Sequence, residues 1–261
     1  MSRIENLNIE FKQMIEFMAR FRNYSPFNNM LVKVQNPSCG FFATEKDWDK
    51  KHGRWLKEDA KPMLILAPMH PVMLVFDQDQ TDGKPLPEEL EKFAKYRGDI
   101  SHECLERAIQ NTEIHYRIRI DFKILSSVSA GFATVVRGDT KCLMRIAIHD
   151  GLDLQSKIGV LCHELGHILL GHLGSGNHNW WPSRQNLGKS TVEVEAETVA
   201  YIATARLGLN GACEEYISRY LKDGVIPSSV SLDSIAKVAG RVEEIFKKRL
   251  SPREMPENKI K

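Results

Sequence analysis

The stretch HELGH at residues 163–167 decides the interpretation of this chain, because it has the spacing of a metal site on a helix. Residues four apart on a helix lie on one face, so His163 and His167 can present imidazole nitrogens to a single ion. Zinc lowers the pKa of a bound water to near neutrality, and the neighbouring Glu164 can then take its proton. The motif therefore predicts a zinc-dependent hydrolase with one Zn²⁺ per chain, in which Glu164 is the general base.

The residues around the motif fit a buried helix. Asp153 or a neighbour can cap the helix, and several apolar residues occupy the other faces: Ile158, Leu161, Leu165, Ile168 and Leu169. The simplest alternative is that His163 and His167 are ordinary core histidines, and that alternative leaves Glu164 without a role.

A catalytic zinc needs a third protein ligand and an open fourth position. His172 follows His167 by five residues, which rotates it off the ligand face, and His178 lies in a loop. The next expected helix carries Glu193 and Glu197 on one face. We expect Glu193 to be the ligand and Glu197 to orient a histidine. The sequence leaves open which glutamate binds the metal, since acids also favour a helix start through its dipole.

Tyr201 lies eight residues after Glu193, roughly on the same helical face. It is a candidate oxyanion stabiliser. The loop around His178, Trp180 and Trp181 is expected either to form a wall of the cleft or to be an ordinary packed loop.

HELGHILLGH at residues 163–172, followed by EVEAETVA at 193–200, resembles the ImmA/IrrE group of zinc metallopeptidases. That group carries HExxH on one helix and E-x-x-A-(acid/Asn)-x-(apolar)-A on the next. The resemblance covers roughly residues 88–225. It implies a gluzincin-like site in which His163, His167 and Glu193 bind zinc and Glu164 is the general base.

A second set of residues resembles the N-terminal domain of ArdC-type antirestriction proteins over about residues 10–80. The matching segments are YSPFNNML at 24–31, QNP at 35–37, Trp48, Gly53-Arg54 and LILAP at 64–68. In that family a single-stranded-DNA-binding domain precedes a zincin domain, the same order as here. The chain departs from the family at KEDAK, residues 57–61, where a basic, glycine-containing turn is usual.

The same segment has the composition of a single-strand binder, since basic residues outnumber acidic ones in residues 1–76 and interleave with aromatic residues. Each tryptophan alone is more typical of a core than of a stacking platform, so the resemblance carries this expectation. The candidate nucleic-acid-binding residues are Tyr24, Asn28, Lys46, Trp48, Lys51, Arg54, Trp55 and Lys57.

The composition bounds the setting of the protein. A formal net charge of +2 demands no nucleic-acid partner and excludes the acidic surface of a DNA mimic. Five widely spaced cysteines without a C-x-x-C pair indicate a reducing compartment. The first residues lack a signal-peptide pattern, and no apolar run approaches the roughly 20 residues of a membrane span. We therefore expect a cytoplasmic protein without membrane contact.

Periodicity and turn signals predict an α+β fold. We expect a small mixed α/β N-terminal domain at residues 1–80, a zincin-like domain with a short sheet and several helices at 81–250, and a charged tail at 251–261. The polar segment Gln78–Pro87 is typical of a linker. The expected helices cover residues 5–22, 26–35, a short piece from 45, 88–112 in two pieces, 190–207, 212–222 and 230–249. The expected strands cover 63–67, 72–76, 114–125, 132–137 and 141–148.

These features favour a two-domain zinc metallopeptidase that acts on a protein or peptide and binds single-stranded DNA through its N-terminal domain. One alternative is an antirestriction or DNA-protecting protein whose zinc domain is not needed for proteolysis. Another is a regulatory peptidase without DNA contact. The sequence leaves open the peptide substrate, the oligomeric state, any need for DNA or a partner, and the choice of zinc over manganese or iron.

Overall fold

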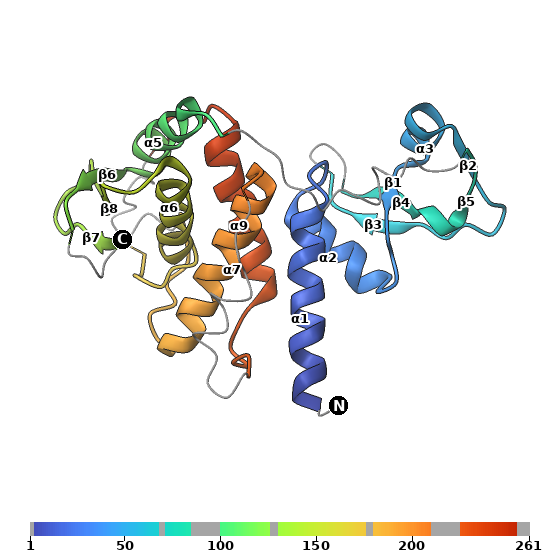
Figure 1. Cartoon of the computed structure of the whole chain (residues 1–261), viewed down its shortest axis with the longest axis horizontal. Helices are drawn as coiled ribbons and strands as arrows, with labels where there is room; N and C mark the ends of the chain where they lie inside the picture. Colours follow the sequence, from blue (N-terminus) through green and yellow to red (C-terminus); the bar gives the residue numbers. More distant parts are fainter. Residues whose placement is uncertain are drawn as a thin grey trace, which may run out of the picture. The chain divides into compact units, whose positions relative to one another are not determined.

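The computed structural model describes residues 3–67, 71–84, 100–125, 130–175, 180–209 and 225–254. The chain divides into two compact units: an N-terminal unit, Lys12–Tyr96, and a C-terminal unit, Arg97–Lys261, with which Met1–Phe11 is grouped. Each unit combines helices with small sheets, so the fold class is mixed α+β, as predicted (Figure 1). Within the described part of the chain, no helix combines the length and hydropathy that crossing a bilayer requires.

The N-terminal unit is entered through helix α1 (Arg3–Arg20), predicted at residues 5–22. Its sheet has the antiparallel strand order β1-β4-β3, and β2 pairs antiparallel with β5 in a separate ribbon. The elements are α2 (Pro26–Gln35), β1 (Phe42–Ala43), α3 (Glu45–His52), β2 (Arg54–Leu56), β3 (Met63–Ile65), β4 (Met73–Asp77), the 3₁₀ turn η1 (Gln78–Gln80) and β5 (Thr81–Gly83).

The predicted helix starts in this unit are confirmed. Ser25 Oγ accepts a hydrogen bond from the Asn28 backbone N–H at 3.1 Å, ahead of proline at the first position of α2. Thr44 Oγ1 accepts from the Asp47 N–H at 3.2 Å and caps α3. Helix α3 ends at Gly53, whose φ of 61° is left-handed and favours glycine.

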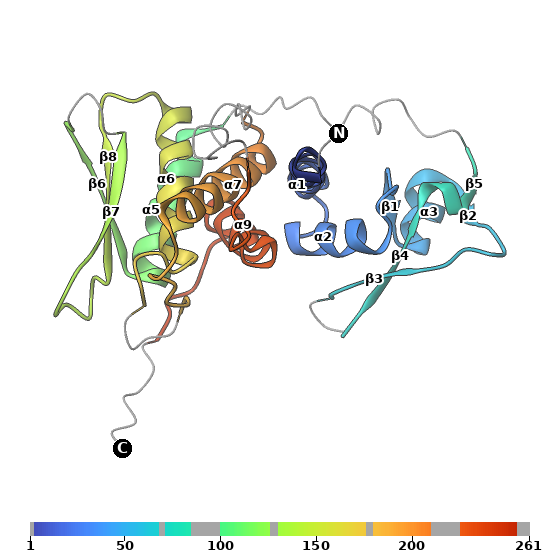
Figure 2. The same cartoon turned by 90° about the horizontal axis from the view of Figure 1, so that it is seen from below.

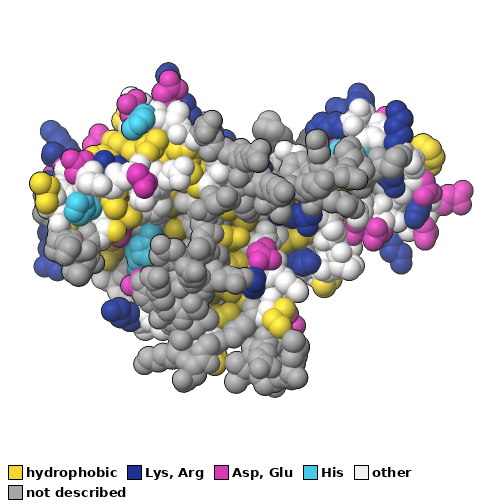
Figure 3. All heavy atoms as spheres, viewed as in Figure 1, with side chains coloured by type: hydrophobic (Ala, Val, Ile, Leu, Met, Phe, Trp, Pro, Cys, Tyr) yellow, Lys and Arg dark blue, Asp and Glu magenta, His cyan; other side chains and the backbone are white. Residues whose placement is uncertain are grey.

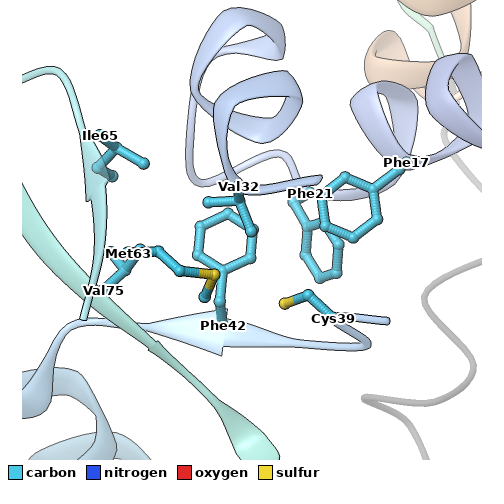
Figure 4. Close-up of a cluster of buried hydrophobic side chains, with 8 residues drawn as sticks. All are labelled: Phe17, Phe21, Val32, Cys39, Phe42, Met63, Ile65 and Val75. Atoms are coloured by element: carbon cyan, nitrogen blue, oxygen red, sulfur yellow. The ribbon is translucent and has the colours of Figure 1, made fainter. Parts of the chain in front are cut away.

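An aromatic cluster forms the core between α1, α2 and the three-stranded sheet (Figure 4). The Phe42 ring lies 5.2 Å from the Phe21 ring and 4.8 Å from the Tyr24 ring, measured between centroids. Burial of rings of this size dominates the stability of so small a unit. The buried members are Phe17, Phe21, Val32, Cys39, Phe42, Met63, Ile65 and Val75.

Two amide side chains of α2 hold the edge strand β3. Asn28 accepts from the Leu66 N–H at 3.0 Å and donates to its carbonyl at 2.9 Å. Two helical turns later, Gln35 forms the same pair of bonds with Leu64, both at 2.8 Å. These bonds fix the distance between α2 and the sheet and satisfy backbone groups that an edge strand otherwise exposes.

The structure differs from the linker predicted at Gln78–Pro87. Residues 78–83 form η1 and β5, and β5 pairs with β2 in the register Arg54↔Gly83. Asp77 caps η1 in a capping box with Gln80, which explains the polar composition without a linker. The N-terminal unit therefore continues beyond its predicted end at residue 80, and residues 85–87 lie outside the described part.

The C-terminal unit is layered (Figures 1 and 2). Its sheet has the order β6-β8-β7, with β6 parallel and β7 antiparallel to the central β8. Helices α5 and α6 pack on the sheet, and α7 and α9 form the next layer. The elements are α5 (His102–Tyr116), β6 (Ile118–Lys123), β7 (Gly131–Val135), β8 (Met144–His149), α6 (Leu154–Leu169), α7 (Lys189–Leu207) and α9 (Leu232–Lys247).

The strand expected at 114–125 begins only at Ile118, because α5 continues to Tyr116 and ends at Arg117, whose φ is 55°. Asp153 caps α6, as predicted, by accepting from the Ser156 N–H at 2.7 Å. The helix expected at 212–222 and the first part of the one expected at 88–112 lie outside the described residues.

Helices α6 and α7 approach each other closely at Gly166. A Cβ added there would lie 3.3 Å from both the Cα and the carbonyl oxygen of Ala196, and 3.5 Å from the Val199 Cβ. Both neighbours are fully buried, and two of the three atoms belong to the backbone. Glycine is therefore what allows the two helices to pack at this distance.

We expect Gly159→Ala and Gly166→Ala, on the same helix, to have different effects on stability. Nothing lies within 4 Å of a Cβ at Gly159, so alanine there should stabilise by up to about 1 kcal/mol through helix propensity. Gly166→Ala should be less stable than Gly159→Ala by roughly 1–3 kcal/mol, because the Ala196 backbone must shift. Urea unfolding of both variants measures this difference, and equal stabilisation would contradict the close approach.

Candidate metal centre

Three side chains from two helices converge on one point. His163 and His167 on α6 have their Nε2 atoms 3.0 Å apart. Oε2 of Glu193, on α7, lies 3.7 Å from His163 Nε2 and 3.8 Å from His167 Nε2. These three residues form the described group whose ligand atoms all lie within 4.8 Å of one another.

The donor set fits a divalent cation. Ligands at about 2.0–2.1 Å from a tetrahedral zinc are separated from one another by about 3.3 Å. The three observed separations, 3.0, 3.7 and 3.8 Å, bracket that value. Two imidazoles and one carboxylate are also a donor set that zinc, manganese or iron accepts, so the geometry indicates a divalent metal without selecting zinc.

Glu197 contacts the other nitrogen of His163. Its Oε2 lies 3.0 Å from His163 Nδ1, one helical turn along α7 from Glu193. A carboxylate in this position accepts the Nδ1–H and leaves Nε2 with its lone pair. Of the two glutamates between which the sequence does not decide, the geometry therefore favours Glu193 as ligand and Glu197 as its supporting partner.

His167 is supported by a buried network that the sequence did not predict. Its Nδ1 lies 3.0 Å from His172 Nδ1, and His172 Nε2 lies 2.9 Å from Glu195 Oε2. Glu195 also accepts from both Nη atoms of Arg184, each at 2.8 Å, and from the Ser231 N–H at 2.7 Å. His172 is thus off the ligand face, as expected, but it contacts a ligand from behind.

Burial shapes the electrostatics of the centre. It raises the pKa of Glu164 to about 7, while the His163 charge and a hydrogen bond from the Ala133 backbone lower it and Glu193 raises it. Burial, with the charges of His163 and His172, lowers the pKa of His167 to about 3. Burial also opposes charge on His163, but the Glu197 hydrogen bond and the charges of Glu197, Glu164 and Glu193 together outweigh it and raise that pKa. Of the two histidines, His163 is therefore the stronger base.

The other predicted residues of this unit lie on α7 and in the loop that precedes it. Tyr201 is half-buried on α7, and its role stays a prediction. His178 lies outside the described residues. Trp180 and Trp181 are buried, and Trp181 Nε1 donates to the Gly174 carbonyl at 2.9 Å, so this part of the loop is packed.

Two of the predicted nucleic-acid-binding residues have structural roles instead. Trp48 is fully buried, and its Nε1 donates to the Phe76 carbonyl at 3.0 Å, so neither ring face is available to a base. Asn28 is buried, and its side-chain amide forms hydrogen bonds with the Leu66 backbone. Tyr24 stacks on Phe42, and burial, with the Asp47 charge, raises its pKa to about 12, although a hydrogen bond from the Thr44 backbone lowers it.

The other five candidates lie on α3, on β2 and just after it. Trp55 is 64% exposed, an unusual exposure for this residue type. Lys46 is exposed. Lys51 Nζ lies 2.9 Å from Asp47 Oδ1, and Lys57 Nζ donates to the Asp79 carbonyl. The Arg54 guanidinium donates to Thr81 and to the Lys84 carbonyl, so it also ties β2 to β5. Figure 3 shows Lys and Arg side chains gathered over α3, with acidic side chains beside them.

A pocket lies next to this basic surface. It is formed where the end of α1, β1 and α3 meet, and it mixes cations with aromatic rings. Its lining includes Arg20, Arg22, Tyr24, Phe41, Lys51 and His52, together with Asp47, which pairs with Lys51. Such a lining suits an anionic ligand that also carries a planar group.

No family model matches the chain, and no curated protein matches it. Two solved structures are similar to it, the crystal structures of the antirestriction protein ArdC from plasmid R388 in metal-free and Mn(II)-bound form. The sequence identities are 16% and 15%, each alignment covers 85% of this chain and 82% of that one, and both TM-scores are 0.38.

We expect Glu193→Ala and His167→Ala each to abolish stoichiometric metal binding, because each removes one of three converging donors. Glu244→Ala is the matched control, since Glu244 is an exposed glutamate that pairs with Lys248 at a helix end. Elemental analysis after dialysis against limiting zinc measures the metal. Wild-type metal content in Glu193→Ala would show that another residue is the third ligand.

Proposed function

We propose that the C-terminal unit is a zinc-dependent metallopeptidase that hydrolyses a protein or peptide. The observation that carries the proposal is the convergence of His163, His167 and Glu193, with the buried carboxyl of Glu164 electrostatically coupled to the same group. Structural zinc sites fill all four positions with protein ligands, whereas three donors and an uncommitted acid are typical of a catalytic site.

The roles of the residues follow from their positions. A bound zinc acidifies water and polarises a carbonyl. Glu164, only 8% exposed, takes the proton from water and returns it to the leaving amine. In the metal-free protein, burial raises the pKa of this carboxyl. The Ala133 N–H holds this carboxyl from the strand side.

Strand β7 offers a place for the substrate. It pairs with β8 on one side, and no other described strand pairs with it. The hydrogen bond from Ala133 to Glu164 places this strand directly beside the general base. An extended peptide aligned along this edge of β7 would present its backbone to the site, as in strand addition.

Glu164→Gln should retain zinc but lower peptide hydrolysis by at least about 100-fold, because an amide cannot take the proton. Glu103→Gln, at an exposed position on α5, is the control. The assay is cleavage of a mixed peptide library, read by mass spectrometry, with and without single-stranded DNA. Unchanged cleavage by Glu164→Gln would rule out the assigned mechanism.

The exposed Trp55 supports a second candidate function, a DNA-protecting or antirestriction protein that binds single strands through its N-terminal unit. Trp55 lies on β2 between the exposed Lys51 and Lys57 in the sequence, and Lys51 also lines a pocket with cationic and aromatic residues. A solvated ring beside cations is what sequence-independent stacking requires. Under this alternative, proteolysis is not needed.

The cytoplasmic location stays a prediction of the sequence.

Trp55→Ala should weaken binding of the full chain to a single-stranded oligonucleotide by roughly 5- to 100-fold, the loss of one base–aromatic stack. Leu64→Ala, which shortens another exposed apolar side chain of the same unit, should bind as wild type does. Fluorescence anisotropy at several salt concentrations measures both. Equal affinities for Trp55→Ala and wild type would remove Trp55 from the interface.

A further inference from the structure

In the buried network behind His167, the donor and the acceptor of each hydrogen bond can be assigned, starting from Glu195. This carboxyl group is fully buried and accepts four hydrogen bonds. Three come from groups that only donate, the two Nη atoms of Arg184 and the Ser231 backbone N–H. Both carboxyl oxygens face such donors, so Glu195 acts as acceptor in every bond it makes, including the one to His172.

The same reasoning assigns the donor and acceptor nitrogens of His172 and His167. Because Glu195 accepts, His172 must carry its proton on Nε2, 2.9 Å from Glu195 Oε2. A neutral imidazole then has a lone pair on Nδ1, which can only accept from His167 Nδ1 at 3.0 Å. His167 is thereby the tautomer whose Nε2 lone pair points toward His163 and Glu193.

We propose that His172 is a positioning residue, which transmits the orientation of the Arg184–Glu195 pair to His167 and fixes the tautomer in which His167 can bind metal. The inference rests on the proposed metal centre, but not on peptidase activity. His172 cannot itself be a ligand in this arrangement, because both of its ring nitrogens are engaged.

The chain between His167 and Arg184 is shaped to hold this geometry. The His172 N–H donates to the His167 carbonyl at 3.0 Å, which fixes the distance between the two residues. Gly171 has a φ of 82°, and a Cβ there would lie 2.1 Å from the Pro182 carbonyl oxygen. The Gly171 carbonyl in turn accepts from the Arg184 N–H at 2.8 Å. The turn thus carries His172 and Arg184 to the same carboxylate.

The Nδ1 atoms of the two candidate ligand histidines therefore have different hydrogen-bond partners. His163 donates directly to a carboxylate, Glu197, at 3.0 Å. His167 reaches its carboxylate, Glu195, only through the second imidazole. A carboxylate behind a ligating histidine raises its basicity and orients its ring, and partners of this kind are typically worth 10- to 100-fold in metal affinity.

The proton positions can be read directly in the full-length wild-type protein. Long-range ¹H–¹⁵N correlation spectra distinguish Nδ1–H from Nε2–H histidines, and the spectra are recorded without metal and with zinc. We expect His172 protonated on Nε2 and His167 on Nδ1, and the latter to persist when zinc is added. A proton on His172 Nδ1 in either spectrum overturns the proposal, because His172 would then donate to His167.

Metal affinity supplies the second test. His172→Leu removes the acceptor and should weaken zinc binding by roughly 10- to 100-fold in a chelator competition. His172→Asn keeps a carbonyl oxygen near the position of Nδ1 and should recover most of that loss, whereas a purely packing role would not separate the two. His102→Leu, at an exposed position of α5, is the control.

The outcomes separate this inference from the function on which it rests. Wild-type affinity in His172→Leu, or equal losses in the leucine and asparagine variants, overturns the positioning role. If the wild-type protein takes up no divalent metal, the proposed metal centre is wrong, and the metal-free spectrum still decides the direction of the network.

Discussion

The close approach of α6 and α7 at Gly166 is the constraint on which the C-terminal unit depends. The candidate ligand histidines lie on one helix and the carboxylate on the other, so their convergence depends on the helix separation that a glycine against Ala196 permits. The same separation brings Glu197 within 3.0 Å of His163 and lets Glu195 reach His172. The glycine at 166 thus favours the helix separation at which these polar contacts form.

Much of the fold could be predicted because its signals are local. The caps at Ser25, Thr44 and Asp153 act within three residues, and the structure confirms the helices that they start. Short or non-local elements escaped prediction. Strand β5 is three residues long and exists because it pairs with β2, so the same polar residues are typical of a linker when read alone.

In the candidate site, too, local patterns could be predicted from the sequence and non-local contacts could not. Residues at fixed helical spacing, His163, His167 and Glu193, could be identified from the pattern, and the structure brings them together. The Glu195 network could not, because Arg184 and Ser231 reach it from segments that no spacing rule connects. In the N-terminal unit, some residues predicted to bind nucleic acid are buried and have structural contacts. Aromatic and amide residues typical of a binding surface, Trp48 and Asn28, are used to hold the core and a strand edge.

The pairing of Asn28 and Gln35 with β3 has a consequence for how the protein behaves in a crowded solution. The outer face of the β3–β4 hairpin is apolar, with Leu64, Leu66, Val72 and Leu74 about half exposed. A hairpin of this composition with an open edge would be a template for aggregation between copies. Because α2 side chains occupy the backbone donors and acceptors of Leu64 and Leu66, a second chain finds no ladder to extend there. The protein can therefore expose leucines on this surface and resist self-association through strand pairing at the same edge.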